Sequence, residues 1–371
     1  MKKIKVLYWS PFIGRVATIK SVINSAKSLN LYSNKFNAII LDCFDEWNYY
    51  KKDILINNTK IIKLNRQFKI DIDSFGFLKS RFIYVKSFFK LYWNLKALII
   101  KEKPEYLIVH LLTYIPFLLF FFNNIKTKLI LRISGKPKKN IFRNLLWKAI
   151  EKKIELIFCP TKETIKHLKK NYFKKSKIIF LPDPVIEDNK YKANIVKKKK
   201  IYFLCVGRLT KQKNHNLLID LYIKYKIKTK LIIVGNGELR NQLLTKIKKN
   251  NLQRLIQIKP FTKKINKYYQ YAIAVLIPSL WEDPGFVMIE SAYLKKPIIC
   301  SNCPSGPKEF LKKNKAGFLF KNNDLESFYK ELKKFESSKK DKINKMIDNA
   351  HKASKKYTLF NHYKILKNYL K

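Results

Sequence analysis

Two carboxylates, Glu282 and Glu290, stand eight positions apart in the most informative stretch of this chain. The apolar run 274–277 before them predicts a buried parallel strand, and residues 287–294 predict the helix that follows. Glu282 then lies in the loop at the carboxyl end of the strand, and Glu290 lies inside the helix. Open α/β sheets bind their ligands at this edge. The spacing therefore suits two acids that hold two separate polar parts of one ligand.

A second stretch, residues 203–215, places two cations in a loop after a predicted strand. The strand ends at Val206, the loop carries Arg208 and Lys213, and a helix begins near Asn214. Cations beside a helix N-terminus form a good site for a diphosphate. Only eight of the 79 basic residues are Arg, so an arginine in this loop favours a functional role. A solvated basic loop is the alternative, and the loop alone does not decide between the two.

Glycine is scarce, with nine residues in the chain, so each position is informative. Gly14 and Gly285 follow predicted strands and are the better candidates for ligand contact, because glycine lets backbone amides approach a ligand closely. We interpret Gly235 and Gly237 as turn residues. His110 ends a buried strand at the ligand edge of its sheet, although a lone histidine is more often structural than catalytic.

Short apolar runs alternate with longer amphipathic ones along the whole chain, which predicts βα units and parallel sheets. The pattern breaks at Pro182-Asp183-Pro184 and at the basic run 197–200, and it resumes at Ile201. We therefore predict two similar doubly wound α/β domains with a crevice between them, over residues 1–190 and 191–350. Residues 351–371 form a C-terminal helix that is able to return to the N-terminal domain. The predicted strands are 4–8, 38–41, 61–64, 106–109, 129–133, 156–159, 178–181, 201–206, 231–234, 256–258, 274–277, 297–300 and 317–320.

The composition is extreme in charge but ordinary in hydrophobic content. A chain of 371 residues with 47% hydrophobic residues is not a disordered polyelectrolyte, despite its net charge of +53. The excess is almost entirely lysine, in a chain that is also rich in Asn, Ile, Phe and Tyr, as AT-rich coding would produce. Attraction to an anionic membrane or to nucleic acid is the alternative explanation, and both stay open.

Cysteine usage and the N-terminus predict a reducing, cytoplasmic location. Five scattered cysteines argue against a disulfide framework. Cys300 and Cys303 have no second pair of ligands nearby, so we interpret them as residues of a strand end and its loop rather than as a zinc site. The first residues are too short in apolar length for a signal peptide. The apolar segment 106–122 contains His110 and Pro116 and is better explained as a strand and a short buried helix than as a membrane span.

The residues now described resemble a known family. The stretch from Val206 to Asn214, the pair Glu282-x7-Glu290 and the segment 301–309 resemble the signature of retaining, nucleotide-sugar-dependent glycosyltransferases of family four, the group 1 type, which have the GT-B fold. Residues 110–113, 129–135 and 159–161 are similar to N-terminal segments of relatives in surface-polysaccharide and lipopolysaccharide assembly. The resemblance covers essentially the whole chain.

The resemblance implies a role for each matching residue on the donor. Arg208 and Lys213 match the basic pair that holds the donor diphosphate, and they stabilise the leaving group. Glu282 matches the acid that faces the donor sugar, and Glu290 matches the acid that binds the ribose.

Further positions match the glycine-containing loops of the family. The amides of Gly285, Phe286 and Val287 match the loop that contacts the sugar and the phosphate. Gly14 matches the first loop of the N-terminal domain, and His110 matches the histidine near the transferred sugar. The sequence between Glu282 and Gly285 departs from the commoner Glu-Gly-Phe-Gly form.

The resulting expectation is a cytoplasmic, peripherally membrane-associated enzyme. It would move a sugar from a nucleotide donor to a glycan or lipid-linked acceptor, without a metal or another cofactor. Residues 77–103 predict a long helix with basic and aromatic residues, either an ordinary packed helix or one that docks on an anionic bilayer. The alternatives are a nucleotide-sugar epimerase of similar fold and, less well supported because no nucleic-acid module is present, a basic nucleic-acid-binding protein.

Overall fold

The chain forms two compact units in the computed structural model. The first unit consists of Met1–Pro184 with Leu359–Lys371, and the second consists of Val185–Thr358. The sequence pattern predicts boundaries after residues 190 and 350. The structure describes residues 3–12, 18–56, 58–65, 85–137, 140–187, 201–312 and 314–371.

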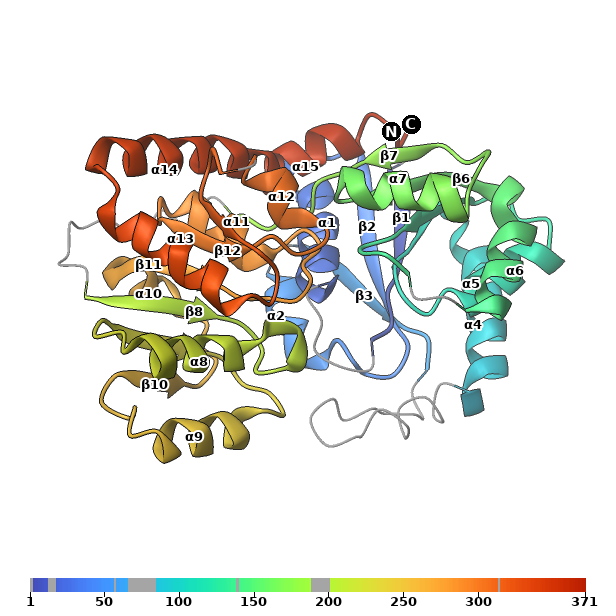
Figure 1. Ribbon diagram of the computed structural model, residues 1–371. Helices are drawn as coiled ribbons and strands as arrows, with labels where there is room; N and C mark the ends of the chain where they lie inside the picture. Colours follow the sequence, from blue (N-terminus) through green and yellow to red (C-terminus); the bar gives the residue numbers. More distant parts are fainter. Residues whose placement is uncertain are drawn as a thin grey trace. The chain divides into compact units, whose positions relative to one another are not determined.

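The first unit is built on a seven-stranded parallel sheet in the order β3-β2-β1-β4-β5-β6-β7 (Figure 1). This order grows outward in both directions from the centre, as in doubly wound sheets. Every strand predicted for this half of the chain is confirmed. The strands are β1 (Ile4–Trp9), β2 (Phe36–Asp42), β3 (Lys60–Lys63), β4 (Tyr106–Val109), β5 (Lys128–Arg132), β6 (Ile154–Cys159) and β7 (Ile178–Phe180).

Helices cover both faces of this sheet because successive strand residues point to opposite sides. Tyr8 packs in a cluster with α1 and α15, whereas its neighbour Trp9 packs in a cluster with α4, α5 and α6. The helices are α1 (Thr18–Tyr32), η1 (Asn48–Tyr50), α2 (Lys51–Leu55), α4 (Phe88–Glu102), α5 (Tyr114–Phe122), α6 (Ile141–Ile150), η2 (Glu151–Lys153), α7 (Lys162–Asn171) and α15 (Leu359–Leu366).

The long apolar segment 106–122 divides into β4 and α5, so the predicted strand and short helix are confirmed. The helix predicted over 77–103 corresponds to α4, and the part before residue 85 lies outside the described residues. Within the described parts of the chain, no helix combines the length and the hydropathy needed to cross a membrane.

The second unit repeats the same plan with six parallel strands in the order β10-β9-β8-β11-β12-β13. The six strands predicted for this half are confirmed. They are β8 (Tyr202–Val206), β9 (Lys230–Val234), β10 (Ile256–Lys259), β11 (Ala272–Ile277), β12 (Ile298–Ser301) and β13 (Phe318–Phe320).

The helices of the second unit also divide between the two faces of its sheet. Helices α8, α9 and α13 pack on one face, and α10, α11 and α12 pack on the other. Helix α14 runs along α11. The elements are η4 (Lys211–Lys213), α8 (His215–Tyr225), α9 (Arg240–Lys249), α10 (Asn266–Tyr271), α11 (Phe286–Tyr293), α12 (Gly306–Phe310), α13 (Leu325–Ser337), α14 (Lys340–Ser354) and η5 (Lys355–Tyr357).

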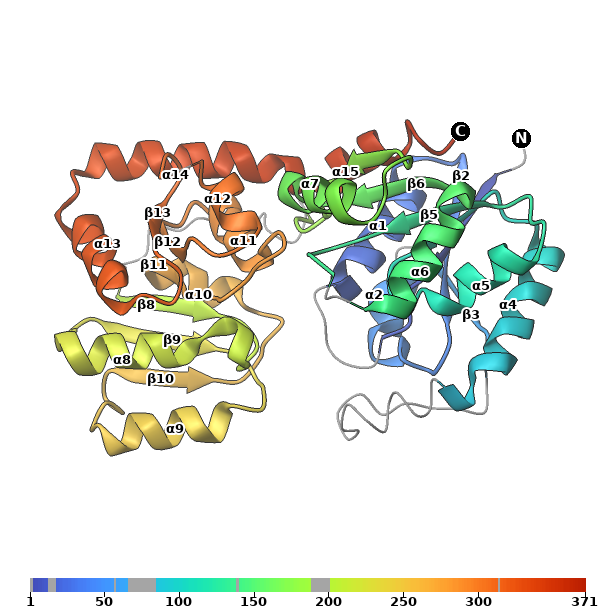
Figure 2. The ribbon, with the colours of Figure 1, turned by 45° about the vertical axis from the view of Figure 1, so that its right-hand side comes forward.

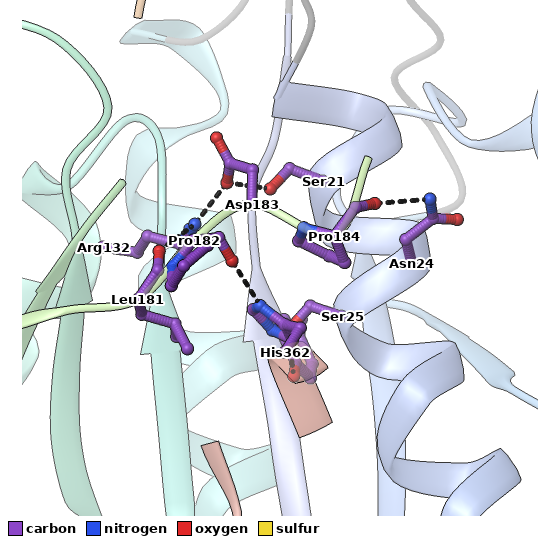
Figure 3. Close-up of polar contacts among 10 residues, drawn as sticks. Ser21, Asn24, Ser25, Arg132, Leu181, Pro182, Asp183, Pro184 and His362 are labelled. Carbon is purple, nitrogen blue, oxygen red and sulfur yellow. Dashed lines mark hydrogen bonds and ion pairs between the residues drawn. The ribbon is translucent and has the colours of Figure 1, made fainter. Parts of the chain in front are cut away.

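The chain leaves the first unit through Leu181–Pro184, and buried side chains fix this segment (Figure 3). Arg132, the last residue of β5, forms an ion pair with Asp183, and both side chains are 2% exposed. Ser21 Oγ donates a hydrogen bond of 2.5 Å to the same carboxylate, and Asn24 Nδ2 donates one of 2.7 Å to the carbonyl of Pro184. Because prolines have no N–H group, the backbones of Pro182 and Pro184 form hydrogen bonds only through their carbonyls.

A second set of bonds attaches the returning helix α15 to the same segment (Figure 3). Burial, with the nearby charge of Arg132, lowers the pKa of His362 to about 3, so its ring is neutral. The carbonyl of Pro182 only accepts, so His362 Nδ1 carries the proton and donates at 2.7 Å. Nε2 then accepts from Ser25 Oγ at 2.8 Å, and Tyr8 donates its hydroxyl proton to Ser25 at 3.0 Å. The Pro182 carbonyl therefore determines which group donates in each hydrogen bond from His362 through Ser25 to Tyr8.

We expect Asp183→Ala to destabilise the protein by about 3–5 kcal/mol, because it leaves the guanidinium of Arg132 buried without a counter-charge. The double variant Arg132→Met/Asp183→Leu should lose less than Asp183→Ala, since it removes both charges together. Urea unfolding followed by circular dichroism measures both.

The control is Asp324→Ala, which removes a partly exposed carboxylate that caps α13 by accepting from the Ser327 amide at 2.9 Å. It should lose much less stability than Asp183→Ala. A loss at Asp183 no larger than this control would contradict a structural role for the buried pair.

Candidate active site

Two loops at the carboxyl edge of the second sheet bring a predicted cation and a predicted acid into contact. Lys213 ends η4 after β8, and Glu282 follows the neighbouring strand β11. Lys213 Nζ lies 2.5 Å from Glu282 Oε1, with side-chain exposures of 15% and 7%. Ser279 Oγ donates to the same carboxylate oxygen at 2.6 Å. The sequence predicted both residues as ligand contacts but did not predict that they pair with each other.

Arg208 lies in the same loop as Lys213, and its side chain is exposed. Its Nη2 donates a hydrogen bond of 3.3 Å to Gln212 Oε1. Gln212 in turn donates from Nε2 to the carbonyl of Trp281 at 2.9 Å. Its backbone carbonyl accepts from the amide of Leu280 at 2.8 Å. Gln212 therefore joins the cation-bearing loop to the acid-bearing loop. The sequence does not predict this role of Gln212, because the only indication there is its position between Arg208 and Lys213.

The backbone of Glu282 is held from a third loop, after β12. Its amide donates to the carbonyl of Pro304 at 2.7 Å, and its carbonyl accepts from Ser305 at 2.7 Å and from Gly306 at 3.0 Å. A Cβ at Gly306 would lie 2.0 Å from the carbonyl oxygen of Pro284, so only glycine fits there. The acid is thus positioned by its backbone as well as by its side chain.

Gly235 and Gly237 do more than form a turn, which corrects our interpretation from the sequence. A Cβ at Gly235 would lie 1.8 Å from the carbonyl oxygen of Gly207, and one at Gly237 would lie 2.5 Å from that of Leu209. The Leu209 amide donates to Asn236 at 2.9 Å in the same contact. The two glycines therefore allow the loop after β9 to lie directly against the loop that carries Arg208.

Helix α11 begins at the predicted glycine loop. Gly285 precedes the helix with φ 99°, a conformation that side chains rarely adopt. The amides of Phe286 and Val287 belong to the first turn, which has no intrahelical acceptors for its N–H groups. Glu290 follows in the same helix and is half-buried. The loop that carries Glu282 thus leads directly into a helix N-terminus, where an anionic ligand group is favoured.

His110 lies in the first unit, immediately after β4. Its amide donates to the carbonyl of Trp9 at 2.9 Å, which continues the parallel ladder between β4 and β1. Burial, with the nearby charge of Arg132, holds the pKa of His110 well below its usual range, so the ring is neutral. Its buried Nε2 has no hydrogen-bond partner among the described residues. Gly14, the other candidate in this unit, lies outside the described residues.

Cys300 and Cys303 are free and buried, and β12 contains the first of them. Burial raises the pKa of the Cys300 thiol well above its usual value and that of Cys303 to about 12. Both are therefore protonated at neutral pH and poorly suited to thiolate chemistry, in agreement with the structural interpretation of this pair.

Two doubly wound units, with paired cation and acid loops at the edge of the second sheet, define a class of enzyme that handles nucleotide-linked ligands. Residues 186–353 match the family "Glycosyl transferases group 1". The chain is a nucleotide-sugar-dependent glycosyltransferase with the two-domain GT-B fold, and its second unit is similar to group 1 glycosyltransferase domains.

Similar proteins include a Campylobacter jejuni enzyme and two solved structures. N-acetylgalactosamine-N,N'-diacetylbacillosaminyl-diphospho-undecaprenol 4-alpha-N-acetylgalactosaminyltransferase is 29% identical over 306 residues, which cover 80% of this chain and 81% of that enzyme. A glycosyltransferase from Rickettsia africae matches 100% of this chain and 98% of its own with a TM-score of 0.80 and 18% identity. HepE from Anabaena, solved with UDP-glucose, matches 99% of both chains with a TM-score of 0.77 and 14% identity.

We expect Gly235→Ala to weaken nucleotide binding and to destabilise the protein by about 1–3 kcal/mol, since the added methyl group must displace the loop of Gly207 and Arg208. Gly317→Ala is the matched control, because its Cβ would lie 3.0 Å from the Ile298 carbonyl oxygen and the Leu311 side chain, away from the loop of Gly207 and Arg208. Calorimetric titration with nucleoside diphosphates compares the two variants. Equal affinities in both would contradict a role of Gly235 in supporting the cation loop.

Proposed function

We propose that this enzyme is a retaining glycosyltransferase that moves a sugar from a nucleotide-diphosphate donor to a glycan or lipid-linked acceptor, without a metal ion. The observation that carries the proposal is the cluster of Arg208, Lys213 and Glu282 at one sheet edge, next to the N-terminus of α11. In the proposed complex, Arg208 and Lys213 bind the diphosphate and Glu282 faces the sugar. The amides of Phe286 and Val287 contact the sugar and phosphate.

The chemistry of sugar transfer explains why two fixed cations suffice in this proposal. Breaking the bond between the sugar C1 and the phosphate oxygen creates an oxocarbenium-like centre and a diphosphate of increasing negative charge. Arg208 and Lys213 stabilise that charge without reorganising, since their loop is already fixed by Gln212 and Glu282. The acceptor hydroxyl then attacks from the same face, and the leaving phosphate takes its proton.

The contact between Lys213 and Glu282 is compatible with donor binding in this scheme. A lysine ammonium group has three N–H donors, so Lys213 is able to keep its bond to Glu282 while it donates to a phosphate oxygen. The pair would then place the carboxylate beside the sugar at the moment the phosphate binds. Neutral His110 would contribute a hydrogen bond to the transferred sugar but no charge.

Surface-glycan assembly is the biological role that we propose. The name of the Campylobacter relative describes an acceptor linked to diphospho-undecaprenol, which is a membrane lipid. A lipid-linked acceptor of this kind would require the enzyme to work at the cytoplasmic face of a membrane as a peripheral protein. The net charge of +53 supports attraction to such a surface.

We expect Arg208→Ala and Lys213→Ala each to lower the rate of sugar transfer by at least about 100-fold, the usual effect of removing one preorganised electrostatic group. Transfer of radiolabelled sugar from candidate nucleotide donors to lipid extracts measures the effect. Lys211→Ala is the control, because Lys211 is an exposed cation of the same turn η4. The control should keep wild-type activity, and wild-type rates in Arg208→Ala and Lys213→Ala would refute the diphosphate assignment. Conversion of the donor without any acceptor would instead support an epimerase.

Glu290 is assigned to the ribose, so we expect Glu290→Ala to weaken nucleoside diphosphate binding about tenfold or more, the loss of one charged hydrogen bond. Glu290→Gln should recover part of the affinity, since its amide still offers an oxygen acceptor. Isothermal titration calorimetry measures both variants. Unchanged affinity in Glu290→Ala would remove the ribose role.

A further inference from the structure

Three neighbouring helices of the first unit expose an unusual number of large apolar side chains. Helix α4 contacts α5, and α5 contacts α6, so the three lie side by side on one face of the sheet (Figure 2). They contain 15, 9 and 10 residues, yet they hold eight of the 18 large apolar side chains that are exposed in the described parts of the chain. We call this surface the α4–α6 face. Its exposed apolar residues are Phe89, Trp93, Ile100, Phe121, Phe122, Ile141, Phe142 and Leu145.

Helix α4 shows that this exposure is a pattern rather than scatter. Its buried stripe consists of Leu91, Leu95 and Ile99, spaced four residues apart, and packs on the sheet. Phe89 and Trp93 are also four residues apart, but they lie on another side of the helix and are 74% and 59% exposed. One apolar stripe therefore fills the core, and the second is mostly exposed, with ring–ring contacts only to the adjacent Phe88 and Tyr92 among the described residues.

Helix α6 adds a second exposed cluster at its first turns. Ile141, Phe142 and Leu145 occupy one side of the helix and are 76%, 79% and 62% exposed. Since α6 follows β5 and packs back along the sheet, its first turns lie toward the carboxyl edge, as do the first turns of α4. His110, at the carboxyl end of β4, belongs to the same edge.

The charges of the α4–α6 face are almost all positive. Residues 85–103, 114–126 and 140–153 contain ten Lys or Arg and two acidic residues, Glu102 and Glu151. Both acids already have partners within the protein. Glu102 pairs with Lys5 at 2.7 Å, and Glu151 accepts from the amide of Lys175 at 2.7 Å. One of these cations lies beside an exposed ring, since Lys96 Nζ is 5.2 Å from the centre of the Trp93 ring.

We propose that the α4–α6 face docks on an anionic lipid bilayer, with its aromatic and aliphatic side chains inserted at the headgroup level and its lysines on lipid phosphates. Aromatic and aliphatic residues flanked by lysine match such an interface in both polarity and charge. A second copy of the chain fits worse, because a symmetric dimer would place this cationic face against itself. The inference rests on the proposed membrane-linked acceptor. The exposed first turns of α4 and α6 lie toward the carboxyl edge of the first sheet, where His110 also lies.

Vesicle co-sedimentation of the full chain tests the proposal without any donor or acceptor, so its result is independent of sugar transfer. The wild-type protein should sediment with phosphatidylcholine vesicles that contain phosphatidylglycerol, less with phosphatidylcholine alone, and less as salt is added. The variants Phe89→Ser/Trp93→Ser and Ile141→Ser/Phe142→Ser should each lower the affinity for anionic vesicles at least about tenfold, because each removes two apolar groups from the interface.

The control is Leu244→Ser/Phe261→Ser, which removes two exposed apolar side chains of the second unit and should bind vesicles as the wild type does. Circular dichroism checks that every variant is folded, and transfer to a water-soluble acceptor should continue in the face variants. Wild-type protein that ignores anionic vesicles, or face variants that bind as the control does, would overturn the proposal. A dimer that the face variants dissociate in the absence of vesicles would assign the surface to a second copy instead.

Discussion

An ion pair between Lys213 and Glu282 joins the two loops on which the chemistry of this enzyme depends. Both groups are largely removed from water, so each requires the other as a partner, and the loops after β8 and β11 must therefore meet. They are able to meet because the doubly wound order makes these strands neighbours, although 69 residues separate the two side chains. Gly235 and Gly306 allow further loops to approach from either side. The contact therefore depends on the strand order and on the glycines that let neighbouring loops approach.

The buried polar groups of the first unit follow a different principle, in which neutral groups replace charge. His110 and His362 are uncharged because burial opposes protonation and Arg132 adds a positive charge nearby. Arg132 itself is balanced by Asp183, so the region contains one compensated pair and otherwise neutral donors and acceptors. Such a network is held by the geometry of its hydrogen bonds more than by charge. It attaches the segment Leu181–Pro184 and helix α15 to the same sheet (Figure 3).

Much of this arrangement could be predicted from the sequence because it depends on local patterns. The alternation of short apolar and longer amphipathic runs predicted all thirteen strands in the described parts of the chain, and the rarity of arginine drew attention to Arg208. Three-dimensional proximity could not be predicted in the same way. Nothing in the sequence indicates that Lys213 pairs with Glu282, or that Gly235 lies against Gly207, because those contacts join separate loops. The contacts of Asp183 with α1 and β5 were missed for the same reason, since Pro182-Asp183-Pro184 looks like a simple break in the pattern.

The lysine excess also has a clearer meaning once the fold is considered. AT-rich coding would raise the number of lysines on every surface, and it would raise the number of Phe and Ile residues as well. Folding then places most apolar residues in the core, so biased coding alone gives charged surfaces with few exposed rings. Helix α9 fits that description, with Lys246, Lys248 and Lys249 and a single exposed leucine. The α4–α6 face does not, because exposed rings occur on three adjacent helices, of which α4 and α6 also carry lysines. Coding bias alone therefore does not explain why lysines and exposed apolar side chains coincide on the α4–α6 face.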